Sequence, residues 1–221
     1  MSAGKHLLAI DTSTSVAAVA IGDANGKLEM EEGWPAGYRH GEDLLPRVRD
    51  LLTGHGIGLD DLIGVVVGTG PGAFTGLRVG IATAKGIAHA LALPIAGVPS
   101  GEALLAAAGV PRAVLLLPAG PNDRVIVRAG RSPERLAGGA EPDLASEDVV
   151  IAIDLDGRAG ADAAARGEAA RAGFAGALLR LGAERLENGG DDLAQLVPEY
   201  VTLPRGVAAA TGEVAWSRDH R

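Results

Sequence analysis

The sequence predicts an α/β protein. Apolar runs with the length and valine content of strands alternate with longer segments whose apolar residues recur at helical spacing. The first half shows this most clearly, because a valine-rich run at residues 62–68 lies between helical segments at 41–53 and 75–93. Further strand-like runs and a long helical segment follow after residue 112, so the same kind of structure is expected in both halves.

The first three elements are expected to be strands joined by turns. The apolar residues 7–10 are followed by "DTSTS" at 11–15, a run of turn-forming residues. Residues 16–21 form a second run rich in Val and Ala, and "DANG" at 23–26 suits a hairpin because Asn and Gly tolerate positive φ. The alternation in "KLEMEE" at 27–32 predicts a half-exposed third strand.

A helix is expected next, at residues 41–53, where leucines and a valine form one apolar stripe. The stripe comprises Leu44, Leu45, Val48, Leu51 and Leu52. Pro46 fits near the first turn, since the first amides of a helix have no partner within it. A buried strand follows at 62–68.

The next helix spans about residues 75–93 and stops before Pro94. A strand at 95–98 and a helix at 100–108 complete the first half, and we place a boundary between two domains there, 1–108 and 109–221. In the second part, strands are expected at 113–117, 124–129 and 149–153, irregular chain at 131–147, and a largely helical segment at 161–186. The last residues, 211–221, show no clear period and are expected to be partly mobile, and the last 25 or so to pack back on the first domain.

The composition of the chain argues against several classes of protein. A net charge of −8 argues against a protein that holds nucleic acid by itself, because phosphate binding needs clustered cations. Cysteine is absent, so disulfides and thiolate chemistry are not expected. No segment has the length of a signal peptide's apolar region or of a membrane span, and we expect a cytoplasmic protein without membrane contact.

The stretch "GTGPGAFTGLRVG" at 68–80 lies between a strand and a helix, where glycine-rich turns often bind phosphate. It has no lysine, so it is not a Walker loop. A dinucleotide fingerprint fits loosely as Gly68-x-Gly70-x-x-Ala73, but the acidic residue expected about twenty residues later is missing. Close packing is the better explanation of these glycines.

Small residues recur every four positions along the 75–93 helix and therefore lie in one row. The row comprises Gly76, Gly80, Ala84 and Ala88, with Leu77 and Ile81 beside it. A glycine inside a helix costs roughly 0.5–1 kcal/mol relative to alanine, so a close contact has to offset that loss. The spacing leaves open whether the row meets the chain's own sheet or another protein.

Other chemistry is sparse. The segment Asp11, Thr12, Ser13, Thr14 is similar to the first phosphate loop of actin-like ATPases and sugar kinases, with a polar hairpin turn as the alternative. None of the five histidines has the His-x-x-x-His spacing of a metal site, and no Gly-x-Ser-x-Gly elbow is present. "DLDG" at 154–157 has too few acids for a calcium loop and is interpreted as a turn after a strand.

Three stretches, taken in order, carry a family resemblance. They are "LLAIDTSTSVAAVAIG", "HGEDLLPRVRDLL" and "VVVGTGPGAFTGLRVGIATAKGIAHALALPIAGVPSGEAL". Together they resemble the TsaB (YeaZ) family over residues 7–105, and the segment 70–78 is the most specific part. Beyond it only "VPEYV" at 197–201 matches faintly.

The resemblance implies an actin-like (ASKHA, ribonuclease H-like) fold with two related subdomains. It also implies a subunit without chemistry of its own in bacterial tRNA threonylcarbamoyladenosine (t6A) synthesis. In that machinery a related catalytic subunit, TsaD, transfers the threonylcarbamoyl group to N6 of A37 in tRNAs reading codons that begin with A. An ATPase, TsaE, completes it. ATP and metal would be used through these partners and none bound by this chain, which would meet tRNA only indirectly.

The family pairs through the two helices that match 41–53 and 75–91 here, so the resemblance implies a partner interface, for TsaD or for a second copy of the chain. The expected interface residues are Leu44, Leu45, Val48, Leu52, Gly76, Leu77, Gly80, Ile81, Ala84 and Ala88. The sequence departs from the family at "PAGPND", 118–123, where an actin-like ATPase would need an acid and glycines for its second phosphate loop. Asp11 to Thr14 are then expected to be the vestige of a nucleotide loop.

Three alternatives stay open. The first is an autonomous small ATPase or kinase of the actin-like superfamily, which would need a second phosphate loop. The second is a glycoprotease-like peptidase, for which neither a metal pair nor a triad is found. The third is a homodimer with an unrelated role, because a pairing helix surface can serve many partners.

Overall fold

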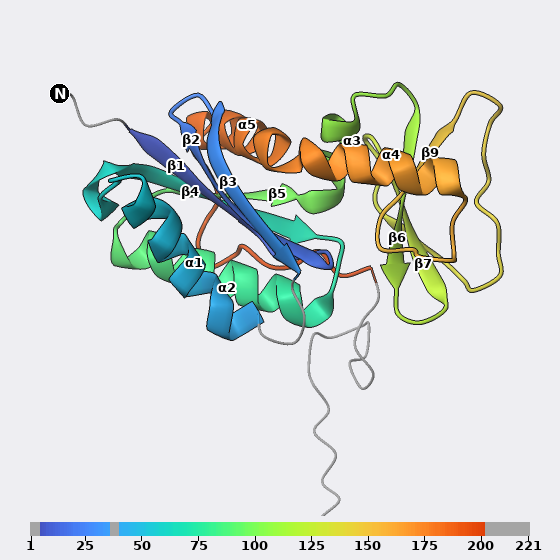
Figure 1. The fold of residues 1–221 in the computed structure, drawn as a ribbon, viewed down its shortest axis with the longest axis horizontal. Helices are drawn as coiled ribbons and strands as arrows, with labels where there is room; N and C mark the ends of the chain where they lie inside the picture. Colours follow the sequence, from blue (N-terminus) through green and yellow to red (C-terminus); the bar gives the residue numbers. More distant parts are fainter. Residues whose placement is uncertain (1–4, 36–39, 202–221) are drawn as a thin grey trace, which may run out of the picture.

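Two mixed β-sheets form the frame of the protein, which is known from a computed structural model that describes residues 5–35 and 40–201 (Figure 1). The first sheet has the strand order β3-β2-β1-β4-β5. Its strands are β1 (His6–Asp11), β2 (Val16–Asp23), β3 (Leu28–Pro35), β4 (Leu62–Gly70) and β5 (Ile95–Pro99). β1 to β3 form an antiparallel meander, and β4 and β5 continue the sheet in parallel.

The second sheet repeats the start of this plan in the order β8-β7-β6-β9. Its strands are β6 (Ala113–Ala119), β7 (Asp123–Arg128), β8 (Glu134–Leu136) and β9 (Val149–Ala152). Again three strands form an antiparallel meander, and the next one in sequence pairs in parallel with the first. The predicted α/β class with two related units is confirmed by this shared topology, while the boundary at residue 108 stays a prediction.

Helices cover both faces of the first sheet (Figure 1). α1 (His40–Gly54) and α2 (Phe74–Ala90) lie on one face, and α5 (Phe174–Glu187) lies on the other. α3 (Ser100–Ala108) and α4 (Ala161–Ala172) connect α5 with the second sheet, and one turn of 3-10 helix, Leu59–Asp61, precedes β4.

The alternation of side chains along β1 shows why this arrangement is stable. Leu8 and Ile10 pack toward α1 and α2, whereas Leu7 and Ala9 pack on the α5 side. The cluster on the α5 side extends without interruption to Leu115 and the rest of the second sheet. One hydrophobic cluster therefore spans the two sheets.

One expectation about the second half is corrected. The short strand β8 lies within 131–147, which was expected to be irregular, because it pairs with β7. The largely helical segment expected at 161–186 is confirmed, and it is divided at Gly173, which ends α4 and begins α5. The division lets α4 pack on β9 while α5 packs on the first sheet.

No helix among the described residues is both long and apolar enough to cross a membrane. The expected mobility of 211–221, and most of the segment expected to pack back on the first domain, lie outside the described residues.

Candidate functional site

Asp11, the first residue of the expected nucleotide loop, is fully buried at the end of β1. Its Oδ2 atom accepts a hydrogen bond of 2.5 Å from Ser100 Oγ, and its Oδ1 atom accepts bonds of 2.8 Å from both the amide and the hydroxyl of Ser13. Ser100 Oγ also accepts from the Gly70 amide at 3.1 Å. Burial raises the pKa of Asp11, and the hydrogen bonds act against that shift. The carboxyl group therefore holds β1, β4 and α3 together.

The hydroxyl groups of Thr12 and Thr14 are also engaged within the chain. Thr12 Oγ1 donates to the Gly76 carbonyl at 2.7 Å, which ties the loop to the first turn of α2. Thr14 Oγ1 donates to the Val16 carbonyl at 2.9 Å. Of the expected loop, Ser13 and Thr14 reach a pocket, whereas Asp11 and Thr12 are absent from its lining.

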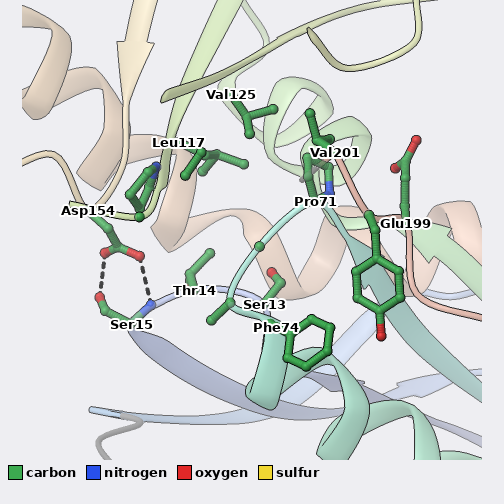
Figure 2. Close-up of a pocket in the computed structure, with 16 residues that line it drawn as sticks. Ser13, Thr14, Ser15, Pro71, Phe74, Leu117, Val125, Asp154, Glu199 and Val201 are labelled. Carbon is green, nitrogen blue, oxygen red and sulfur yellow. Dashed lines mark hydrogen bonds between the residues drawn. The ribbon is translucent and has the colours of Figure 1, made fainter. Parts of the chain in front are cut away.

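The pocket, with a volume of about 550 Å³, lies where loops from both halves meet (Figure 2). Hydroxyl-bearing residues form one wall and apolar or backbone groups form most of the rest. The lining residues are Ser13, Thr14, Ser15, Pro71, Gly72, Ala73, Phe74, Leu117, Pro118, Ala119, Gly120, Val125, Asp154, Glu199, Tyr200 and Val201.

Asp154, which follows β9, reaches across the pocket wall to the loop after β1. Its Oδ2 atom accepts from the Ser15 amide at 2.7 Å, and its Oδ1 atom accepts from the Ser15 hydroxyl (Figure 2). Arg171 of α4 donates to Asp154 Oδ1 at 2.8 Å and to Thr14 Oγ1 at 3.1 Å. The residue pattern at 154–157 predicts only a turn, although an acid directly after a parallel strand was a usable signal.

Residues 191–201 form a third part of the site, named here the C-terminal strap. The Glu199 amide donates to the Thr69 carbonyl at 2.7 Å, and Arg78 Nε of α2 donates to the Tyr200 hydroxyl at 2.8 Å. Burial, followed by the charge of Glu102, raises the pKa of Glu199. The strap thus carries Glu199, Tyr200 and Val201 to the pocket rim.

The turn after β6 lacks the acidic residue of a second phosphate loop. There the pocket is lined by Pro118, Ala119 and Gly120, none of which has a side chain that could bind a metal ion or act as a general base. Asp123 is paired with Arg135 and accepts from the Gly138 amide, and Arg135 lowers its pKa. Within residues 5–35 and 40–201, no three His, Asp or Glu side chains form a group that could hold a metal ion.

The small-residue row of α2 faces the chain's own sheet. Gly76, Gly80, Ala84 and Ala88 are buried, and a Cβ atom added at Gly80 would lie within 3.0 Å of Thr12 Oγ1. Of the ten residues expected at a partner surface, all except Leu45 are buried in the chain itself. In this fold α2 packs against β1 and β4, and α1 packs against α2, β2 and β3.

A second row of small residues lies on the solvent side of the same helix. It comprises Thr75, Val79, Ala82, Gly86 and Ala90, all exposed or half-buried. A Cβ atom added at Gly86 would meet nothing within 4 Å. Leu45 on the neighbouring α1 has 54% of its surface exposed. Both rows have helical spacing and small residues, so the sequence pattern did not distinguish the covered row from the open one.

Comparison with known proteins gives one family. The family model described as TsaD, tRNA N6-adenosine threonylcarbamoyltransferase, matches residues 35–171. The chain is 40% identical over 96 residues to the tRNA threonylcarbamoyladenosine biosynthesis protein TsaB of Escherichia coli. That match covers 42% of this chain and 39% of the relative. The TsaB protein of Haemophilus influenzae is 36% identical over 102 residues, covering 46% and 42% respectively. These matches therefore span less than half of the relatives' length.

Two solved structures match over nearly the whole chain. YeaZ from Pseudomonas aeruginosa superposes with a TM-score of 0.67 and 27% identity, over 89% of this chain and 99% of that one. A protein of that organism described as similar to peptidase YeaZ gives a TM-score of 0.70 and 26% identity, over 90% and 100%. The expected actin-like fold is thereby confirmed, and the chain belongs to the tRNA N6-adenosine threonylcarbamoyltransferase family, within its TsaB (YeaZ) group.

Proposed function

We propose that this chain is a non-catalytic subunit that pairs with a TsaD-like catalytic subunit and activates it. The catalytic subunit would transfer a threonylcarbamoyl group to N6 of A37 in tRNAs that read codons beginning with A. A TsaE-like ATPase would complete the machinery. ATP and metal would be bound by those partners, and the chain would meet tRNA through them.

One observation carries the proposal, namely that the two aspartates of the cleft between the halves, Asp11 and Asp154, are bound by donors of the chain itself. Asp11 is surrounded by Ser13 and Ser100, and Asp154 is held by Ser15 and Arg171. General acid–base chemistry needs a group that can reach a substrate, and each of these two carboxylates already accepts three hydrogen bonds within the chain. The site is therefore better suited to stabilising the fold than to turning over a substrate.

Among the ten interface residues expected from the sequence, Leu45 alone is exposed in this chain, so a partner surface on the same two helices would need other residues. We propose that the open row of α2, Thr75, Val79, Ala82, Gly86 and Ala90, meets the partner together with Leu45 of α1. Small side chains allow two helices to approach closely, which increases the buried contact between them. The same row could also pair two copies of this chain when the catalytic subunit is absent.

A transfer assay tests the proposed role. The TsaD-like and TsaE-like proteins of the same organism, with tRNA and threonylcarbamoyl adenylate, should form t6A slowly alone and rapidly once this chain is added. The chain alone should produce none. Equal rates with and without the chain would contradict the activating role, and ATP turnover by the isolated chain would instead favour an autonomous enzyme.

A further inference from the structure

Three hydrogen-bond donors from two segments converge on the Asp154 carboxylate. The backbone amide and the hydroxyl of Ser15 bind it from the loop after β1 (Figure 2). The Arg171 guanidinium binds it at 2.8 Å from α4. Amide, hydroxyl and guanidinium donors are the groups with which proteins bind phosphate and carboxylate ions. The donors of Ser15 and Arg171 thus have the chemistry of an oxyanion-binding site, and the bound oxyanion is the protein's own Asp154 carboxylate.

The charged pair of the cluster is largely shielded from solvent, although Ser15 is exposed, and this shielding strengthens the contact between Arg171 and Asp154. The side chains of Arg171 and Asp154 retain only 17% and 14% of their exposed surface. Glu168 also approaches Arg171, with 3.6 Å between Oε1 and Nε, but its side chain is 72% exposed. Salt and water weaken the exposed Glu168–Arg171 contact more than the shielded Asp154–Arg171 contact. Asp154 is therefore the main counter-ion of Arg171.

The backbone at Asp154 is held in an unusual conformation that delivers this carboxylate. Its φ angle is +57°, in the left-handed region that residues with a Cβ atom rarely adopt, although Asp tolerates it better than most. The turn continues to Gly157, which has φ +67°. A glycine at 154 would fit the same backbone, which makes removal of the carboxylate alone feasible.

We propose that Ser15 and Arg171 form an oxyanion site that Asp154 fills, so that the chain closes the wall between its halves without an external anion. Phosphate and carboxylate ions are the ligands that the emptied site would take. The intact protein would exclude them there, because its own carboxylate holds every donor. The oxyanion site does not depend on the proposed partner surface, because it involves the loop after β1 and α4 and none of the open row of α2.

Asp154→Gly tests the proposal through rescue by added anions. The full chain is heated with sodium phosphate, sodium formate or sodium chloride at equal ionic strength and pH 7. A ligand present at about five times its dissociation constant stabilises by about 1 kcal/mol, which corresponds to about 2–4 °C in a chain of this size. Relative to chloride, we expect phosphate or formate to raise the Tm of the variant by that amount more than they raise the Tm of the wild type.

Two further variants make the test specific. Asp154→Gly combined with Arg171→Gln should lose the rescue, because the guanidinium is the charged donor. Asp156→Gly removes an exposed acid from the same turn and should behave as the wild type. No anion-specific gain in Asp154→Gly, or an equal gain in the wild type or Asp156→Gly, would overturn the proposal.

A folding defect also gives a decisive result. If Asp154→Gly is purified unfolded, it is refolded in each of the three salts and followed by circular dichroism. Recovery in phosphate or formate but not in chloride supports the oxyanion site. Recovery in none of them, or equally in all three, contradicts it.

Discussion

At the scale of single residues, Asp11 shows how a side chain suited to catalysis can serve the fold. Burial raises its pKa, so the folded state binds a proton more tightly than the unfolded chain does. Asp11 therefore favours folding most below its unfolded pKa of about 3.8, and this contribution is lost as the pH rises through the raised, folded-state value.

Asp11→Asn should remove this dependence while keeping the size of the side chain. We expect the free energy of unfolding of the wild type, relative to that of the variant, to fall from pH 3 upward and then level off. Urea unfolding at several pH values measures the difference. The same comparison cancels Glu31 and Glu199, whose pKa values burial also raises. If the free energy of unfolding of the wild type instead rose with pH relative to that of Asp11→Asn, the argument that burial raises the pKa of Asp11 would be contradicted.

At the scale of elements, α2 separates what the sequence could and could not predict. Its period, glycine content and end before Pro94 followed from local residue types. Local residue types could not predict which side of α2 the sheet covers. Gly80 and Gly86 are the same residue in a sequence and differ only in their three-dimensional neighbours. The bridge from Asp154 to Ser15 was missed for the same reason, since 139 positions separate the two residues.

The two glycines should respond oppositely to alanine. Gly80→Ala places a methyl group against Thr12 and should destabilise the chain by about 1–3 kcal/mol through overpacking. Gly86→Ala faces open space and should stabilise the helix by about 0.5–1 kcal/mol. Denaturant unfolding of the two variants checks the assignment of the rows. A tolerated Gly80→Ala would show that the row is not packed as described.

At the scale of the whole molecule, one core spans both sheets through α3 and α5. Leu104 of α3 is 2% exposed and belongs to that core, so both halves depend on it. Leu104→Ala should lower the free energy of unfolding by about 2–5 kcal/mol. Hydrogen exchange should show the same loss of protection in β1 and β6, because the halves unfold together. Loss confined to one sheet would indicate two independent units.

The central claim about function is that the open row of α2 contacts the catalytic subunit. A binding measurement tests this claim most directly. The affinity of the TsaD-like catalytic subunit is measured by calorimetry for the wild type, for Ala82→Arg in the open row, and for Ala165→Arg, an exposed alanine of α4. A long charged side chain in a close helix contact should weaken binding at least about tenfold, or about 1.4 kcal/mol, without lowering Tm. We expect this loss for Ala82→Arg alone. Binding of Ala82→Arg as tight as that of the wild type would place the partner elsewhere, and a wild type that does not bind would contradict the proposed subunit role.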